Sequence, residues 1–110
     1  MDNPSTLVVL VNTASEEEAV GIARTIVDER LAACANIVRG VRSIYRWQGK
    51  VEDETETTMI IKTVPERLSA LTKRIVELHS YDVPEVIALA VVGGHAPYLD
   101  WVSENSNGSA

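Results

Sequence analysis

The spacing of hydrophobic and polar positions along the chain predicts an alternation of strands and helices. Residues 7–12 form a short apolar run rich in β-branched residues, typical of a strand buried on both faces in the centre of a sheet. From Ser15 to about residue 32, apolar residues recur every three or four positions, which is the period of an amphipathic helix. Ser15 as N-cap and Glu18 three residues later form a capping box, so we expect the helix to begin there.

The middle of the chain predicts a long β-hairpin over residues 35–63. Strand-forming residues are mixed with arginines up to Trp47, and Gly40 within this segment marks a bulge or a bend. Gln48-Gly49 is typical of a tight reversal. The returning strand ends in the apolar segment 59–61, so we expect its second half to be buried.

The remaining sequence predicts a helix, a strand and a final short helix. Thr63 as N-cap, with Pro65 and Glu66 in the first turn, begins the helix. Residues 86–92 predict a second apolar strand in the centre of the sheet, and Pro97 opens the last helix.

The order β-α-β-β-α-β with a C-terminal helix is the ferredoxin-like α+β pattern. Right-handed crossovers then place both long helices on one face of a four-stranded antiparallel sheet. We expect a single domain over residues 1–110, with a core over residues 7–104 and a disordered tail over residues 105–110.

The predicted hairpin is too long for an isolated subunit. Strands of about a dozen residues rise ~3.3 Å per residue and reach roughly 40 Å, whereas a compact domain of this size has a radius of gyration of only ~13 Å. The projecting part carries Ile44, Tyr45 and Trp47, which form an aggregation-prone edge unless another chain covers it. We therefore expect a homo-oligomer built through the hairpin.

Composition and charge narrow the classes of partner. Ten Lys and Arg residues against sixteen Asp and Glu residues give a formal net charge of −6, with no basic run, so nucleic acid and membrane surfaces are poor partners. No apolar run approaches the ~20 residues of a membrane span, and no signal peptide precedes the first strand. The single cysteine excludes an intrachain disulfide, so we expect a cytoplasmic protein.

Three residues are candidates for binding soft or borderline metal ions. Cys34 is either a small buried hydrophobic residue or a thiolate ligand for an ion such as Cu(I). His79 follows the second long helix and is either a C-terminal cap or a ligand. His95 lies in a Gly-Gly-His loop and is either solvated or metal-binding.

The third strand adds a row of carboxylates. Glu52, Glu54 and Glu56 share one face of this strand, either as a charged surface that prevents mispairing or as a site for a hard cation. We expect burial and a specific role only for Glu56, which lies nearest the apolar half of the strand. We expect the five aromatic residues to pack within or between subunits: Tyr45, Trp47, Tyr81, Tyr98 and Trp101.

The signatures of common enzyme classes are missing, so we expect a protein without catalytic activity. An acylphosphatase-like enzyme on the same fold would need a phosphate-binding loop with an arginine, and residues 12–15 contain neither glycine nor arginine. One cysteine and two histidines complete a metal site only with carboxylates or water, so a site shared between chains is easier to build.

Five segments in a fixed order carry a family resemblance. They are ERLAACANI at 29–37, SIYRWQGK at 43–50, Glu56 with IIKT at 60–63, HSYDVPE at 79–85 and YLDW at 98–101. Together they resemble the CutA-type divalent-cation-tolerance proteins, over about residues 7–104. The resemblance implies a ferredoxin-like subunit in a tight homotrimer, with hairpins paired across subunits and a role in tolerance of copper or other divalent cations.

The same resemblance implies residue roles. Cys34, Glu56 and His79 are the expected metal ligands, near the clefts between subunits. The residues expected to line these clefts or the interface are Tyr45, Trp47, Tyr81 and Trp101. Because the family resembles PII-type signalling trimers, a signalling or scaffold trimer that binds a small effector or a protein partner in the clefts is the alternative.

Two positions depart from the family pattern. Ser80 stands where the family usually has proline, which loosens the turn after His79. Leu78 stands where some members have a second histidine, so a two-histidine copper site is not available.

Overall fold

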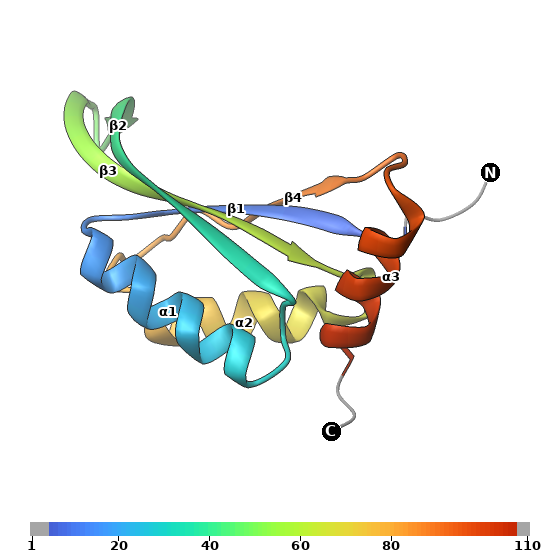
Figure 1. Ribbon diagram of the computed structural model, residues 1–110. Coiled ribbons are helices and arrows are strands. Elements are labelled where there is room, and N and C mark those ends of the chain that lie inside the picture. The colour runs from blue at the N-terminus through green and yellow to red at the C-terminus, as the bar shows by residue number, and fades with distance from the viewer. Residues whose placement is uncertain (1–4, 108–110) are drawn as a thin grey trace.

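A computed structural model describes residues 5–107 as a four-stranded antiparallel sheet with two helices against one face (Figure 1). Its elements are β1 (Leu7–Thr13), α1 (Glu16–Asp28), β2 (Cys34–Trp47), β3 (Lys50–Thr63), η1 (Pro65–Arg67), α2 (Leu68–Leu78), β4 (Ile87–Ala90) and α3 (Ala96–Asn105). The strand order is β2-β3-β1-β4, and α3 lies at the end of the sheet remote from the hairpin tip. The predicted ferredoxin-like α+β fold is confirmed.

The core lies between the sheet and the helices α1 and α2. In β1 the side chains alternate, so Val9 and Val11 are fully buried toward the helices while Val8 and Leu10 on the other face are only half-buried. The prediction of a strand buried on both faces is therefore wrong for the isolated subunit. The helices contribute the apolar stripe that their periodicity predicts: Ala19, Ile22, Ala23 and Ile26 from α1, and Leu71 and Ile75 from α2.

The fourth strand lies at the edge of the sheet, which corrects the prediction of a central position. Only residues 87–90 form the strand, and all four are exposed. The ferredoxin-like connections place β1 and β3 in the middle, so β4 pairs with β1 alone. Its large side chains, Ile87 and Leu89, pair with Leu10 and Val8 on the sheet face that no helix within residues 5–107 covers.

The hairpin of β2 and β3 turns where predicted. Trp47 pairs with Lys50, and the two residues between them, Gln48 and Gly49, have φ angles of 50° and 82°. These angles fit a type I′ turn, which is the turn type that two-residue hairpin loops favour. The hairpin curls beyond the helices in Figure 1, and the molecule extends over 43 Å in its longest direction.

A β-bulge divides the hairpin into two halves. The register passes from Val38 opposite Thr58 to Val41 opposite Glu56, so two residues of β2 face one of β3, and Gly40 takes a φ of 68°. The predicted bulge is confirmed. Because side chains alternate with period two, the extra residue exchanges the faces of β2 beyond this point.

The ends of the helices differ in part from the prediction. Ser15 accepts a hydrogen bond from the backbone N–H of Glu18 at 3.1 Å, as expected for the N-cap of α1. The helix ends at Asp28 rather than near residue 32, and Arg30 adopts a φ of 59° just after it.

The predicted N-cap of the second helix, Thr63, does not cap it. Thr63 is the fully buried last residue of β3, and its hydroxyl donates a hydrogen bond to the backbone oxygen of Leu31 at 2.7 Å. The short helix η1 precedes α2 instead, with Val64 at the N-cap position, so Glu66 completes no capping box with Thr63.

The sequence predicts a disordered tail over residues 105–110. Asn105 ends α3 and Ser106 is buried, so this part of the tail packs on the domain. Residues 108–110 lie outside the described residues.

Candidate functional site

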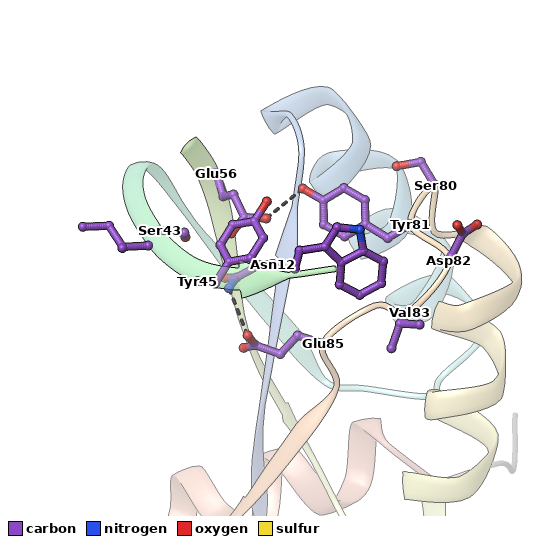
Figure 2. A pocket seen from close by; sticks show the side chains of 11 residues that line it. Asn12, Ser43, Tyr45, Glu56, Ser80, Tyr81, Asp82, Val83 and Glu85 are labelled. Carbon is purple, nitrogen blue, oxygen red and sulfur yellow. Dashed lines mark hydrogen bonds between the residues drawn. The ribbon is translucent and has the colours of Figure 1, made fainter. Parts of the chain in front are cut away.

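A cavity of about 710 Å³ lies between the outer half of the hairpin, the end of β1 and the segment that follows α2 (Figure 2). It is lined by three aromatic side chains, three carboxylates and no lysine, arginine or histidine. The lining residues are Asn12, Ser43, Ile44, Tyr45, Trp47, Glu56, Ser80, Tyr81, Asp82, Val83 and Glu85.

The bulge in β2 determines which side chains reach this cavity. Beyond the bulge, Tyr45 pairs with Glu52 and Val41 with Glu56, so Tyr45, Trp47 and Glu56 share one face of the hairpin. Without the extra residue, Tyr45 and Trp47 would lie on the opposite face from Glu56. The negative charges along β3 surround Tyr45, and burial together with Glu54, Glu56 and Glu52 raises the pKa of its phenol.

Glu56 is buried in the cavity wall, as its place near the apolar half of β3 predicts. It is 6% exposed, and one carboxylate oxygen accepts a hydrogen bond of 2.7 Å from the hydroxyl of Tyr81. Burial, and then this hydrogen bond, raise the pKa of Tyr81 far above its usual value. Tyr81 is therefore a neutral donor that holds the Glu56 carboxylate in place.

Glu85 brings a second carboxylate to the same cavity. The side-chain NH2 of Asn12 donates to Glu85 at 3.1 Å (Figure 2). The side-chain oxygen of Asn12 accepts from the hydroxyl of Thr58 at 2.6 Å. Burial, followed by the negative charge of Glu56, raises the pKa of Glu85. Two carboxylates that repel one another across a cavity favour the binding of a cation between them.

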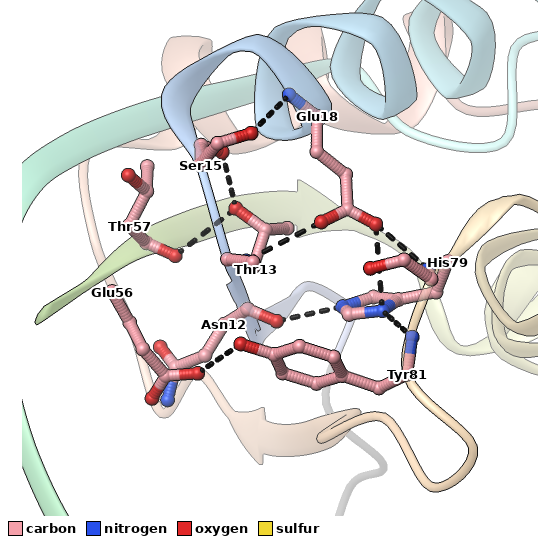
Figure 3. A network of polar contacts seen from close by, with 10 residues as sticks. Asn12, Thr13, Ser15, Glu18, Glu56, Thr57, His79 and Tyr81 are labelled. Atoms are coloured by element: carbon pink, nitrogen blue, oxygen red, sulfur yellow. Dashed lines mark hydrogen bonds and ion pairs between the residues drawn. The ribbon is translucent and has the colours of Figure 1, made fainter. Parts of the chain in front are cut away.

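His79 anchors the cavity-lining loop to the end of β1 (Figure 3). Its Nε2 lies 2.7 Å from the backbone oxygen of Asn12, and its Nδ1 accepts from the backbone N–H of Tyr81 at 3.0 Å. This pattern assigns the neutral tautomer with the proton on Nε2. The His79 side chain is fully buried, and both ring nitrogens are occupied, so a metal ion on either one displaces a hydrogen bond.

Glu18 adds a third link between the same segments. One carboxylate oxygen accepts from the backbone N–H of Ser80 at 2.7 Å and the other from that of Ala14 at 3.3 Å (Figure 3). Burial opposes ionisation of Glu18, but the hydrogen bonds from Ser80 and Ala14 outweigh it and lower its pKa. The capping box predicts that Glu18 binds near the N-cap of α1. Its role in holding the segment after α2 was missed.

Cys34 lies at the other end of the hairpin. It pairs with Lys62, six residues along β3 from Glu56, which corresponds to about 20 Å of strand. Its sulfur lies 3.8 Å from the hydroxyl of Tyr98, and this contact, followed by burial, raises the pKa of Tyr98. Within one chain, Cys34 therefore does not join His79 and Glu56.

Two further candidates also lie away from the cavity. Trp101 stacks on Tyr98 with ring centroids 5.7 Å apart, on α3, and His95 precedes α3 in an exposed loop. Within residues 5–107, no three His, Cys, Asp or Glu side chains of one chain are grouped as a metal site.

Sequence reasoning found part of this site and missed part. Glu56, Tyr45, Trp47 and Tyr81 were candidates and meet at the cavity, whereas Asn12 and Glu85 were not. Asn12 had a signal, because it is a polar residue within the apolar strand β1, and Glu85 closes the HSYDVPE segment.

These features define a ferredoxin-like protein with a long hairpin and an acidic, aromatic cavity. Residues 7–105 match the family model of the CutA1 divalent ion tolerance protein. The chain is 48% identical over 99 residues to the divalent-cation tolerance protein CutA of Thermus thermophilus, covering 90% of this chain and 96% of that protein. It is 45% identical over 103 residues to the chloroplastic protein CutA 1 of Oryza sativa, covering 94% of this chain but only 58% of that protein.

A solved structure agrees with these sequence matches. The crystal structure of CutA1 from Oryza sativa superposes with a TM-score of 0.92 at 43% identity, covering 97% of this chain and 98% of that chain. The chain belongs to the CutA1 divalent ion tolerance protein family, which confirms the resemblance seen in the five segments.

The family is defined by tolerance of divalent ions and not by a reaction, so the chain is classed as a non-enzymatic protein. No helix within residues 5–107 is long and apolar enough to cross a membrane. The rice relative is named as chloroplastic, so family membership does not fix the compartment.

Proposed function

We propose that this protein binds divalent cations, copper among them, and that the cavity carboxylates Glu56 and Glu85 hold the ion. The observation that carries the proposal is the convergence of these two carboxylates in a cavity lined by no basic side chain. Each carboxylate uses one oxygen for its described hydrogen bond, to Tyr81 or to Asn12, and has a second oxygen for a cation. The family description supports a role in tolerance of divalent ions.

A softer site with Cys34, His79 and Glu56 is the version that the sequence favours for copper. Thiolate and imidazole suit copper better than carboxylates do, and copper is expected to bind more tightly than zinc. The separation of Cys34 from Glu56 along β3 means that this site needs the thiolate of a neighbouring subunit. His79 would also have to release Asn12 or Tyr81.

We further propose a homotrimer, with the hairpin and the uncovered sheet face in contact with neighbouring subunits. The support is the exposure of large apolar side chains on this face and along the hairpin. These side chains include Ile44, Tyr45, Trp47, Ile87 and Leu89. Three subunits of 12.0 kDa give about 36 kDa, and light scattering at low micromolar concentration tests this value.

A signalling or scaffold trimer that binds a small effector or a protein partner is the second candidate. The size of the cavity favours it, because about 710 Å³ falls within the range of small-molecule sites and exceeds what a metal ion fills.

We propose the cytoplasm as the compartment. The single cysteine, which allows no disulfide within the chain, supports a reducing environment. Cell fractionation with an antibody against the protein tests this assignment.

A copper titration monitored by native mass spectrometry tests the binding proposal, because it reports stoichiometry and assembly together. The carboxylate site predicts that Glu56→Gln and Glu85→Gln weaken copper binding and that Cys34→Ser does not. The thiolate site predicts loss in Cys34→Ser and His79→Ala. The exposed residue Glu66, outside the cavity, provides the matched control Glu66→Gln, which removes one charge elsewhere. If all variants bind copper like the wild type as trimers, both site assignments are wrong and the effector-binding candidate gains support.

A further inference from the structure

We propose that the cavity beside the hairpin binds a small organic ammonium ion, either an amine or a quaternary ammonium compound. This inference rests on the proposed function, in that the Glu56–Glu85 cavity is taken as the protein's cation site. It adds a class of bound molecule that contacts the aromatic walls of the cavity. A hydrated divalent ion cannot use these walls, because aromatic rings do not coordinate it.

The charge of the cavity favours a cation. Glu56, Asp82 and Glu85 line it without a lysine, arginine or histidine among the lining residues. Arg42 and Arg46 of the hairpin pair with Thr55 and Val51, so both lie on the face opposite to Glu56. Arg42 is also bound through two hydrogen bonds of 2.9 and 2.7 Å to Asp53.

The aromatic side chains favour a cation of the organic kind. Tyr45 and Trp47 line the cavity, and 37% and 43% of their surfaces stay exposed in the single subunit, which leaves ring area for a ligand as well as for a neighbouring subunit. Tyr81 lies against His79 with ring centroids 4.7 Å apart and is further fixed by its bond to Glu56. Ammonium groups are attracted to the faces of such rings, and desolvation strengthens the attraction.

The size and remaining lining of the cavity agree with this ligand class. A volume of about 710 Å³ accommodates an ion with a carbon skeleton. Val83 offers apolar contact for methyl or methylene groups, and Glu56 and Glu85 each keep a second carboxylate oxygen for the charge. An ammonium ion between the two carboxylates relieves their mutual repulsion.

Fluorescence titration of Trp47 tests the proposal. The chain has two tryptophans, so Trp101→Phe, on α3 and outside the cavity, leaves Trp47 as the single reporter. Choline is compared with 3,3-dimethylbutan-1-ol, its neutral carbon isostere, and butylamine represents the primary amines. We expect choline or butylamine to saturate the signal with an affinity at least about tenfold above that of the neutral isostere.

Variants of the carboxylates separate a charge effect from a structural effect. Glu85→Gln and Glu56→Gln keep a side-chain oxygen that accepts from Asn12 or Tyr81, so we expect weaker binding of the ammonium ions and unchanged binding of the isostere. Glu66→Gln is expected to change neither. Equal affinity for the charged and neutral ligands, or no saturable binding of either ammonium ion, overturns the proposal.

The copper titration without any organic ligand distinguishes the two proposals. In one outcome the trimer binds copper, loses it in the carboxylate variants and yet does not discriminate between choline and its isostere. This result overturns the ammonium proposal and leaves the metal proposal standing. Selective ammonium binding without copper binding supports the ammonium proposal and refutes the metal proposal.

Discussion

The hydrogen bond from Tyr81 to Glu56 is expected to stabilise the fold as well as the cavity. Tyr81→Phe removes one oxygen and leaves a carboxylate that is only 6% exposed without this donor. Hydrogen bonds to charged groups contribute about 1.5–3 kcal/mol, and water has little access to replace the lost donor. We therefore expect Tyr81→Phe to lower the free energy of unfolding by about 2 kcal/mol at neutral pH.

Urea unfolding followed by circular dichroism measures this loss. With a slope of about 2 kcal/mol per molar urea, the midpoint falls by about 1 M. Wild type and variants are compared at one protein concentration, because subunit association makes the midpoint depend on concentration.

Tyr98→Phe is the matched control for this measurement. Among residues 5–107 its hydroxyl contacts only the sulfur of Cys34, at 3.8 Å, and the residue is 42% exposed. We expect a loss below about 0.5 kcal/mol, as for other exposed positions. A loss for Tyr81→Phe no greater than that for Tyr98→Phe would refute the assigned role of the Tyr81–Glu56 bond.

A double-mutant cycle isolates the charge of Glu56. In the Glu56→Gln background the hydroxyl of Tyr81 donates to a neutral amide oxygen, so Tyr81→Phe is expected to cost only about 1 kcal/mol. An equal cost in both backgrounds would show that the charge of Glu56 adds nothing to this hydrogen bond.

Four further results are expected. Trp47→Ala should lower trimer stability by up to about 4 kcal/mol per interface, with an unfolding midpoint that depends on protein concentration; an unchanged midpoint at two concentrations would show that Trp47 is merely exposed. Gly49→Ala should cost about 1 kcal/mol in thermal unfolding, because the turn needs a φ of 82°. Glu85→Gln should raise stability by less than about 1 kcal/mol at neutral pH, since the raised pKa means that ionisation opposes folding; the gain should vanish as pH falls below 4.5, and a constant gain would contradict this sign. Glu18→Gln should do the opposite, because the pKa of Glu18 is lowered: its contribution is present above pH 4.5 and disappears as pH falls through the lower folded-state value, which acid titration of both proteins checks.

The sequence predicted the elements better than their environments. The period of α1, the Gln48-Gly49 turn and the Gly40 bulge follow from local chemistry, and each was found where expected. The position of β4 was wrong because an apolar strand has the same pattern whether its own chain or another chain covers it. Thr63 was misplaced because a hydroxyl at the end of a strand serves either a helix cap or the core, and here it binds Leu31.

The site was predicted where a residue's own surroundings along the chain indicate its role. Glu56 stood out because it borders the apolar half of β3, and its burial followed. Asn12 and Glu85 are 73 residues apart in sequence, and their contact depends on how the loop after α2 returns to β1. His79 was considered as a ligand, whereas its hydrogen bonds to Asn12 and Tyr81 show an anchoring contact that no local pattern reveals.

The bulge at Gly40 also bears on how the family's sequences are to be aligned and engineered. One extra residue exchanges the two faces of β2. If an alignment places a single-residue gap wrongly at this point, residues such as Tyr45 and Trp47 are compared with residues of the opposite face, where Ile44 and Arg46 lie. A change in hairpin length therefore preserves the cavity wall only when residues are added or removed in pairs within one strand, with the partner strand adjusted to match. Whether the number of residues between Val38 and Val41 is odd or even therefore specifies the surface that the hairpin presents, more than which residues they are.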